Sequence, residues 1–336
     1  MSRTFPRNLL NLALALTLIS SVASAQYTLT ALVKNTGKKP DKQLINPWGL
    51  AYGPGGAFWL SDAGSGLSTL YTGAGVKQSL VVTIPPGSGK GLGSPTGIVY
   101  NGSSEFQIDS WTSAFLFATL DGTISGWSDF DPNNALIGVN NSASGAMYTG
   151  LAITSHASGN MIYAADFAKN KVDVYNGTFK LVNSFTDTSL PAGFAPFGIQ
   201  DIGGQVYVAF AAQNGKAGGY IDIFDENGTF VKTLIKGKPL NQPWGFAVAP
   251  KNFGPLSNTL LISNNTNSGT INGFNPTTGA LVGTIENSAS KPIHINQLWG
   301  IEFGGGSADN GATNQLFYTA GPDNNLDGVF GVINFN

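Results

Sequence analysis

The 336-residue chain contains no cysteine and only two histidines, His156 and His294. Without cysteine there are no disulfides, no thiolate metal ligands and no cysteine nucleophile. Two histidines are too few for a histidine-rich metal centre. Because no disulfide can crosslink the chain, its stability has to come from packing.

Charge of either sign is also scarce. Charged residues make up 11% of the chain, the net charge is −2, and no basic cluster exceeds Lys38-Lys39. Nucleic acids and anionic membranes bind through concentrated positive charge. We therefore expect neither of them to be a partner.

The motifs of several enzyme classes are missing as well. The chain contains no HExxH zinc motif, no GxSxG nucleophile turn and no complete phosphate-binding loop. These absences favour a binding protein over an enzyme with one of those sites.

Long apolar runs are absent after the N-terminal region, which has the pattern of a secretory signal peptide. Arg3 and Arg7 precede the apolar run 9–19, and the small residues Ala23-Ser24-Ala25 follow it. The alternative is a retained membrane anchor, but the run is shorter than the about 18 residues that a spanning helix needs. We expect cleavage after Ala25, no later membrane span, and a periplasmic or extracellular protein.

Glycine is abundant, and a glycine-centred motif recurs through the chain. The segments NPWGLAY, SPTGIVY, MYTGLAI, APFGIQD, QPWGFAV and QLWGIEF share one pattern. Their glycines, 47 to 55 residues apart, are Gly49, Gly97, Gly150, Gly198, Gly245 and Gly300. Repeats of this length are typical of propellers and other repeat architectures.

Each repeat contains further short apolar segments. KVDVY (171–175) and YIDIF (220–224) alternate apolar and polar residues with the period of a β-strand. Turn pairs such as Asn176-Gly177 then lead to a fourth strand. Helical spacings are absent from the repeats, and leucine-rich repeats are shorter, at about 20–29 residues. We predict an all-β, six-bladed β-propeller with four-stranded blades.

The two chain ends indicate how the ring closes. The sixth repeat stops at its third strand, GVFGVINFN, whereas the strand YTLTALV from Tyr27 precedes the first repeat. We predict that this N-terminal strand completes the last blade, which removes free sheet edges and holds both termini. Residues 26–336 would then form a single domain, which we expect to be a monomer.

The repeat resembles the NHL-type propellers, whose strands begin with Pro-x-Gly and often end in Ala-Asp. Asp62 and Asp166 occupy that last position, and the other four repeats do not keep it. The stretches 117–127, 193–200 and 319–331 further resemble a family of exported bacterial propeller proteins. That family has no assigned activity, so the resemblance implies a fold and not a function.

Three candidate binding features belong to the repeat itself. Trp48, Trp244 and Trp299 precede the shared glycine, where they could pack between blades or form an aromatic wall for a ligand. The position two after the glycine holds Ala51, Val99, Ala152, Gln200, Ala247 and Glu302. A carboxylate on an innermost strand is costly to bury, so Glu302 should face the wet channel, a metal or a hydrogen-bond donor.

The loops that enter the inner strands supply polar side chains. They are Asn46, Asn241, Gln242, His294, Asn296 and Gln297. In a propeller such loops gather around one mouth of the channel, where amides suit sugar or peptide groups, although they also serve as ordinary turn residues. His156 lies in a polar turn, where we expect it to be exposed and passive.

Two metal sites are conceivable. Asp323, Asn325, Asp327 and Gly328 match the first half of a calcium loop, but the closing glutamate is absent and a plain hairpin turn is the alternative. Lactonase-type propellers, which share the architecture, hold a divalent cation in the channel. Here such a site would use Asp62, Asp166, Asn264 and Glu302.

The sequence leaves two main functions open, and a structural role at the cell surface is a third. The first is a non-catalytic exported propeller that binds a glycan, peptide or protein at its channel face. The second is a divalent-metal-dependent hydrolase, lactonase or lyase centred on Glu302, with Ca²⁺ as the candidate ion. Whether the protein is an enzyme is not decided by the sequence.

Overall fold

The structure is a computed structural model that describes Met1 and residues 26–155 and 159–336. The predicted signal peptide, apart from Met1, and His156 lie outside the described residues. Among the described residues, no helix has both the length and the apolar character needed to cross a membrane.

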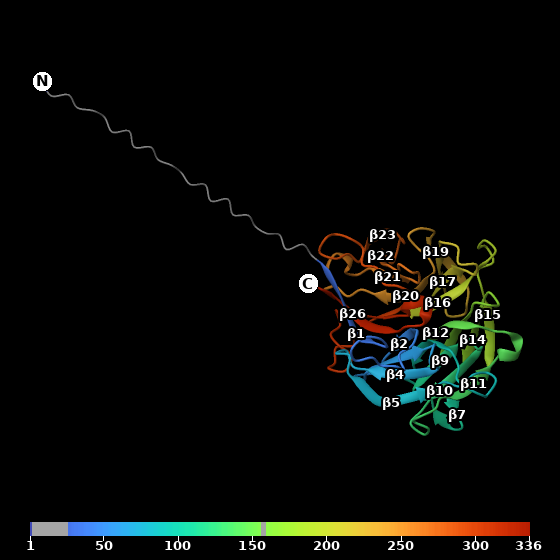
Figure 1. Ribbon diagram of the computed structural model, residues 1–336. Helices are drawn as coiled ribbons and strands as arrows, with labels where there is room; N and C mark the ends of the chain where they lie inside the picture. The colour runs from blue at the N-terminus through green and yellow to red at the C-terminus, as the bar shows by residue number, and fades with distance from the viewer. Residues whose placement is uncertain (2–25, 156–158) are drawn as a thin grey trace.

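Six four-stranded antiparallel sheets form a ring, as predicted (Figure 1). Blade 1 comprises β2 (Pro47–Ala51), β3 (Phe58–Asp62), β4 (Leu67–Tyr71) and β5 (Lys77–Thr83). Blade 2 comprises β6 (Pro95–Tyr100), β9 (Phe115–Thr119), β10 (Thr123–Trp127) and β11 (Leu136–Asn140). Blade 3 comprises β12 (Tyr148–Thr154), β13 (Met161–Asp166), β14 (Lys171–Asn176) and β15 (Leu181–Phe185).

The second half of the ring repeats this order. Blade 4 comprises β16 (Phe194–Ile202), β17 (Gln205–Ala212), β18 (Tyr220–Phe224) and β19 (Phe230–Lys236). Blade 5 comprises β20 (Pro243–Val248), β21 (Leu260–Asn264), β22 (Ile271–Phe274) and β23 (Leu281–Thr284). Blade 6 comprises β24 (Leu298–Phe303), β25 (Leu316–Ala320), β26 (Val329–Phe335) and β1 (Tyr27–Lys34).

A few short elements lie in the connections. They are the hairpin strands β7 (Gln107–Ile108) and β8 (Trp111–Thr112), the 3-10 turns η1 (Ser142–Ser144) and η2 (Gly254–Leu256), and α1 (Pro322–Asn325).

Strand β1 closes the ring, as the sequence predicted. It pairs antiparallel with β26 from Tyr27 opposite Phe335 to Lys34 opposite Val329. The Tyr27 hydroxyl donates a hydrogen bond of 2.7 Å to the Phe253 carbonyl oxygen of blade 5. The N-terminal strand therefore links the last two blades without a disulfide.

The alternating strand directions sort the connections onto two faces of the ring. We call the face that carries the connections into each first strand, and from each second to each third strand, the entry face. The exit face carries the connections from first to second and from third to fourth strands. The first strands surround the central axis, so their N-terminal ends point to the entry face and their C-terminal ends to the exit face.

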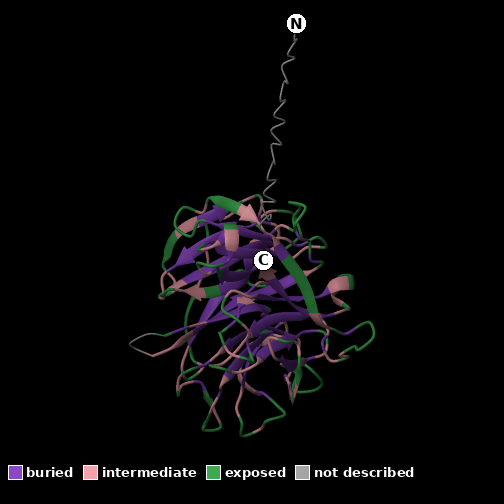
Figure 2. Ribbon diagram, turned by 90° about the vertical axis from the view of Figure 1, so that its left-hand side faces the viewer, coloured by how far each residue is buried: buried purple, intermediate pink, exposed green. Residues whose placement is uncertain are grey.

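The shared glycines allow the inner strands to approach each other. A Cβ added at Gly198 would overlap the Trp244 carbonyl oxygen, and one added at Gly97 would overlap the Leu151 amide nitrogen. Burial is concentrated in the interior of the blades and between them, whereas exposed segments lie in outer strands and loops (Figure 2). The close approach explains why the repeat needs glycine there.

Candidate functional site

Four aromatic side chains close the channel near the entry face. Trp48, Phe197, Trp244 and Trp299, each directly before a shared glycine, form one buried cluster. Trp48 stacks on Trp299 at a ring-centroid distance of 3.5 Å, and Trp48 meets Trp244 edge-on at 6.0 Å. Trp48 also lies 6.2 Å from Phe197 of blade 4, on the other side of the ring. We call these four residues the aromatic plug.

Hydrogen bonds hold two indoles of the plug in place. The Trp244 Nε1–H donates to the Thr149 carbonyl oxygen of blade 3 at 2.9 Å. The Trp299 Nε1–H donates to Asn46 Oδ1 at 3.0 Å. Both bonds join different blades, so the tryptophans brace the ring across its axis. The tryptophans of blades 1, 5 and 6 therefore pack between blades, which is one of the two roles that the sequence suggested, and their rings are buried at the axis.

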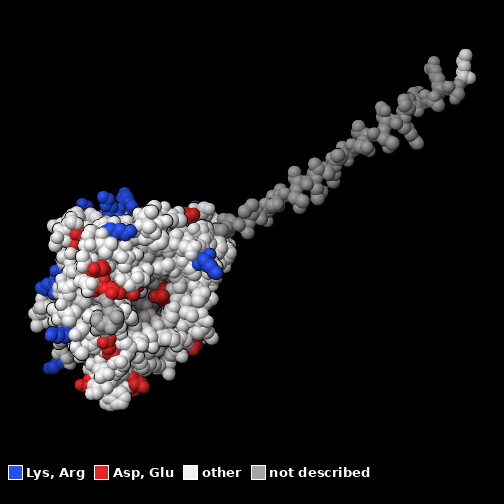
Figure 3. All heavy atoms as spheres, turned by 180° about the vertical axis from the view of Figure 1, so that it is seen from behind, with Lys and Arg blue, Asp and Glu red and all other residues white. Residues whose placement is uncertain are grey.

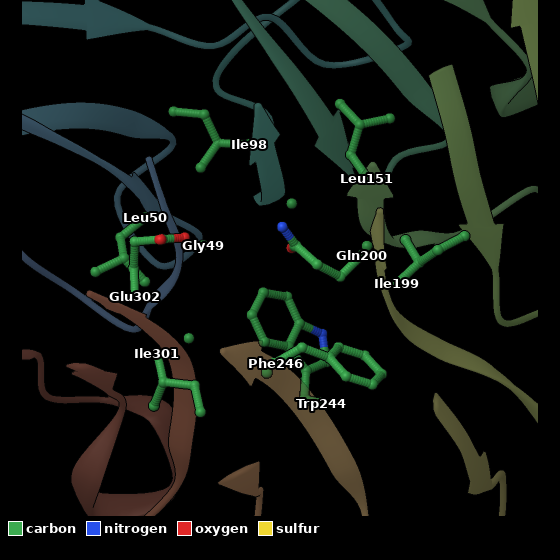
Figure 4. A pocket seen from close by; sticks show the side chains of 14 residues that line it. Gly49, Leu50, Ile98, Leu151, Ile199, Gln200, Trp244, Phe246, Ile301 and Glu302 are labelled. Carbon is green, nitrogen blue, oxygen red and sulfur yellow. The ribbon is translucent and has the colours of Figure 1, made fainter. Parts of the chain in front are cut away.

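Beyond the plug, toward the exit face, the channel forms a pocket of about 40 Å³. Its wall consists of shared glycines and the residues that follow them, together with Trp244. Gln200 of β16 and Glu302 of β24 extend into this pocket from opposite sides, with their polar ends directed toward each other (Figure 4). The structure therefore brings together the two exceptions at the position two after the glycine.

The Glu302 carboxyl group is half-buried, and burial raises its pKa to about 7. A hydrogen bond from the backbone N–H of Phe303 opposes this shift only in part. Tyr52, which sequence analysis missed, donates its hydroxyl to the Phe303 carbonyl oxygen at 3.1 Å. Burial, helped by the negative charge of Glu302, raises the pKa of Tyr52 to about 12. The carboxylate is thus poised to change charge near neutral pH.

The amides of the entry loops are engaged in the fold. Asn46, Gln242 and Gln297 each lie three residues before a shared glycine and adopt left-handed backbone conformations with φ of 48°, 51° and 49°. Asn46 holds Trp299, and the Gln242 side chain donates to the carbonyl oxygens of Ala212 and Lys216 at 3.3 and 3.2 Å. These contacts give them a structural role, and ligand binding by them stays a prediction.

The remaining entry-loop candidates also have protein partners. The Gln297 and Asn296 side chains donate to Asn267, at 2.7 and 3.2 Å, and Asn241 donates its backbone N–H to Asn264 Oδ1 at 2.9 Å. His294 is exposed, and its Nδ1 lies 2.9 Å from the Ser268 hydroxyl. All of them are on the entry side of the aromatic plug, so they do not share the pocket of Glu302.

The proposed channel metal site is not assembled. Asp62, Asp166 and Asn264 end the second strands of blades 1, 3 and 5, opposite the first residues of the inner strands. Glu302 lies at the other end of its inner strand, opposite Phe317. No group of three or more His, Asp or Glu side chains suited to a metal occurs among the residues that the structure describes. The three strand ends point to the entry face in separate blades, so the structure does not place them beside Glu302.

Asp62, Asp166 and Asn264 instead anchor local turns. Asp62 is buried and accepts hydrogen bonds from the Thr69 amide and hydroxyl at 3.1 and 2.7 Å. Burial raises the pKa of Asp62 well above its usual range, and burial also raises the pKa of Asp166. Asn264 donates to the Pro239 carbonyl oxygen at 2.8 Å.

The calcium-loop candidate is a tight turn. Asp323 and Asn325 have φ of 54° and 67°, and the backbone amides of Asn325 and Asp327 donate to the carbonyl oxygens of Gly321 and Pro322 at 2.9 and 3.0 Å. The Asp327 carbonyl oxygen in turn accepts the amide of Asn46 at 2.9 Å. The turn therefore supports the entry loop of blade 1, and calcium binding by it stays a prediction.

The two faces of the ring differ in charge. The exit-face connections contain more acidic residues than lysines. The lysines are Lys180 and Lys251, and the acidic residues are Glu105, Asp109, Asp129, Asp131, Asp225, Glu226 and Asp309. The entry-face connections carry most of the lysines, namely Lys38, Lys39, Lys42, Lys90, Lys169, Lys216, Lys238 and Lys291. Figure 3 shows acidic side chains around a central hollow and at the lower end, with lysines toward the margin.

No protein-family model matches the chain. It is 30% identical over 321 residues to uncharacterized protein R648 of Acanthamoeba polyphaga mimivirus. This match covers 89% of this chain and 77% of that protein. It is 26% identical to uncharacterized protein L690 of the same virus, over 87% of this chain and 80% of the relative. These relatives are viral, so the bacterial origin that the resemblance implied is not supported.

Solved structures with the same fold include two lyases and a further enzyme. A streptogramin B lyase structure is similar with a TM-score of 0.55 at 13% identity, over 94% of this chain and 100% of that one. Virginiamycin B lyase from Staphylococcus aureus gives 0.55 at 12% identity, over 92% and 99%. A luciferin-regenerating enzyme gives 0.54 at 12% identity, over 87% and 91%. At these identities the likeness shows the propeller fold alone.

Proposed function

This chain belongs to the family of uncharacterized protein R648. For this chain we propose the function of an exported, non-catalytic binding propeller. Its channel pocket would receive a cationic side chain of a peptide or protein partner. The observation that carries the proposal is the placement of Gln200 and Glu302 in one pocket on the acidic exit face. The equivalent positions of the other four blades hold small or apolar residues, so these two polar groups are specific to the pocket.

The size of the pocket favours an end group over a whole metabolite. Its volume is about 40 Å³, whereas sites for drug-sized ligands occupy roughly 300–1,000 Å³. The aromatic plug closes the channel behind it, so a ligand enters only from the exit face. The ammonium group of a lysine side chain is small enough for such a site, and the rest of the partner would remain outside the channel.

Charge supports a cation as the bound group. The partly desolvated Glu302 carboxylate lacks a cationic partner among the ion pairs of the described residues, which are Lys77 with Asp41 and Lys171 with Asp173. An ammonium group would return the electrostatic stabilisation that the carboxylate loses on burial. The side-chain oxygen of Gln200 is able to accept a second hydrogen bond from the same group.

One observation favours the alternative, an enzyme of the hydrolase, lactonase or lyase class. The pKa of Glu302, about 7, suits a general acid or base at neutral pH. The pocket wall, however, contains no second titratable side chain that could act as the partner acid or base of Glu302. We therefore rank binding above catalysis.

Calorimetric titration with the peptide Gly-Lys-Gly, blocked at its N-terminus so that lysine carries its one ammonium group, tests the proposal, with the lysine-acetylated form of the same peptide as the matched probe. We expect the unmodified peptide alone to bind at pH 8, and Glu302→Gln to weaken binding at least tenfold because it removes the charge. His294→Ala, on the other side of the plug, is the control and should bind normally. Binding should weaken as the pH falls through about 7, where Glu302 becomes protonated.

The possible contrary results separate the alternatives. Equal binding of the two peptides would rule out recognition of the ammonium group. Turnover of lactone or ester substrates that is lost in Glu302→Gln would favour the enzyme. Binding of neutral oligosaccharides that depends on Glu302 would make the partner a glycan.

A further inference from the structure

Blade 2 carries two large aromatic side chains on its surface that stack on each other. Trp111 is 46% exposed and Phe130 is 56% exposed. Their ring centroids are 4.8 Å apart, with an angle of 16° between the planes. Trp111 belongs to β8, between the first and second strands of the blade, and Phe130 follows the third strand. Both therefore lie on the exit face, the face onto which the Glu302 pocket opens.

Local hydrogen bonds fix this pair, which we call the aromatic platform. Strands β7 and β8 pair Ile108 with Trp111 in a two-residue hairpin. On the other side, the Trp127 Nε1–H donates to the Pro132 carbonyl oxygen at 3.0 Å, and Asp131 accepts the Asn133 amide at 3.2 Å. A preformed platform binds without the cost of ordering its loops.

The surroundings of the platform are acidic. Residues 91–168 contain no Lys or Arg at all. Asp109 lies in the hairpin turn before Trp111, and Asp129 and Asp131 flank Phe130 in the sequence. The Asp131 carboxylate accepts hydrogen bonds from Asn133 and Asn134 of its own loop. Asp109 and Asp129 are exposed and form no ion pair with the described lysines. A cation is attracted both by these carboxylates and by the face of an aromatic ring.

We propose that the aromatic platform, with Asp109 and Asp129, is a second contact site that binds an arginine side chain of a basic peptide segment. A planar guanidinium group stacks on aromatic faces and pairs with carboxylates, which an ammonium group does less well. The identity of the partner as a polypeptide rests on the proposed function. Two cation sites on one face would make the binding of a segment with a lysine and an arginine stronger than that of either residue alone.

The test compares three peptides on the full mature chain by calorimetry. One peptide contains a single arginine among glycine and serine residues, a second joins an arginine to a lysine through a glycine-serine spacer, and the third is Gly-Lys-Gly. We expect Trp111→Ala to weaken the arginine peptide and the two-cation peptide about tenfold and to leave Gly-Lys-Gly unchanged. Phe130→Ala and the pair Asp109→Asn with Asp129→Asn should weaken the same two peptides.

A matched control comes from the same face. Val76 is 59% exposed in a third-to-fourth-strand connection of blade 1, and Val76→Ala should change no affinity. Thermal unfolding should show that Trp111→Ala folds normally, because Trp111 lies in a surface hairpin and is 46% exposed.

Each result bears on one site at a time. Loss of arginine binding in Trp111→Ala supports the platform even when Gly-Lys-Gly fails to bind, in which case only the channel proposal fails. Arginine binding that is equal in the wild type and in Trp111→Ala overturns the platform. Binding of a neutral oligosaccharide such as cellohexaose that is lost in Trp111→Ala, without arginine binding, also overturns it and assigns the surface to a glycan.

Discussion

Two layers of the same six inner strands do different work in this propeller. The layer before the shared glycines holds Trp48, Thr96, Thr149, Phe197, Trp244 and Trp299 and is closed by ring contacts and hydrogen bonds. The layer two residues after the glycines is mostly small and apolar, and its two exceptions, Gln200 and Glu302, reach an open pocket. Three residues along a strand thus separate a structural layer from a candidate binding layer.

The comparison shows how a repeat can carry both stability and specificity. Large rings are tolerated in the plug because they fill the axis where four blades meet. Small residues in the next layer leave space, and a polar side chain there gains access to solvent. Substitutions in the plug should therefore lower the free energy of unfolding at any pH, whereas substitutions in the pocket should change binding and, at Glu302, the pH dependence of stability.

The largest effect is expected for Trp299→Ala. This variant removes a buried ring and deprives Asn46 Oδ1 of its donor, so the free energy of unfolding should fall by about 3–5 kcal/mol. Urea denaturation measures the loss. The same substitution at exposed Trp111 should cost less than about 1 kcal/mol. Equal losses at the two positions would mean that the plug does not brace the ring.

Gly198→Ala tests the close approach between the two layers. Its new methyl group would overlap the Trp244 carbonyl oxygen, so blades 4 and 5 would have to separate, at a cost of about 1–3 kcal/mol. Gly56→Ala is the control, because the nearest atom to a Cβ there lies 3.6 Å away. Denaturation should show that the control is neutral or slightly stabilised. An unchanged free energy of unfolding in Gly198→Ala would indicate that the inner strands are not tightly packed.

Glu302→Gln should change how stability depends on pH. Burial raises the pKa of Glu302 from 4.5 to about 7, so the folded wild type retains a proton that the unfolded chain releases. The stability that this proton gives to the folded state is fully present below pH 4.5 and is lost as the pH rises through about 7. The variant should therefore be more stable than the wild type at pH 8, by about 1–3 kcal/mol. Unfolding midpoints of both proteins from pH 4 to 9 test this, and parallel curves would contradict it.

The smallest effect on stability is expected for Gln200→Ala. The side chain is exposed in the pocket, so its removal should change the free energy of unfolding by less than about 0.5 kcal/mol. Affinity for Gly-Lys-Gly should nevertheless fall several-fold, because one acceptor is lost. A large loss of stability would place Gln200 in the structural layer instead.

The sequence alone identified much of the site by its exceptions to the repeat. Gln200 and Glu302 stood out because the other equivalent positions are small or apolar, and the structure places both in one pocket. The four residues of the predicted channel metal site are not brought together, because Asp62, Asp166 and Asn264 end second strands at the entry face, whereas Glu302 lies toward the exit-face end of an inner strand. Tyr52 was missed because nothing in its own repeat marks it, and its contact is with blade 6.

The sequence by itself determined the number of blades, the four strands in each and the closure by β1. These features follow from local periodicity and from the spacing of glycines, which do not depend on contacts between distant blades. Only the tertiary structure decided that the tryptophans meet across the axis and that most lysines lie on the entry face, which leaves the exit face with an excess of acidic residues. Ring closure brings blades 1 and 4 into contact, and alternating strand directions sort the loops onto two faces.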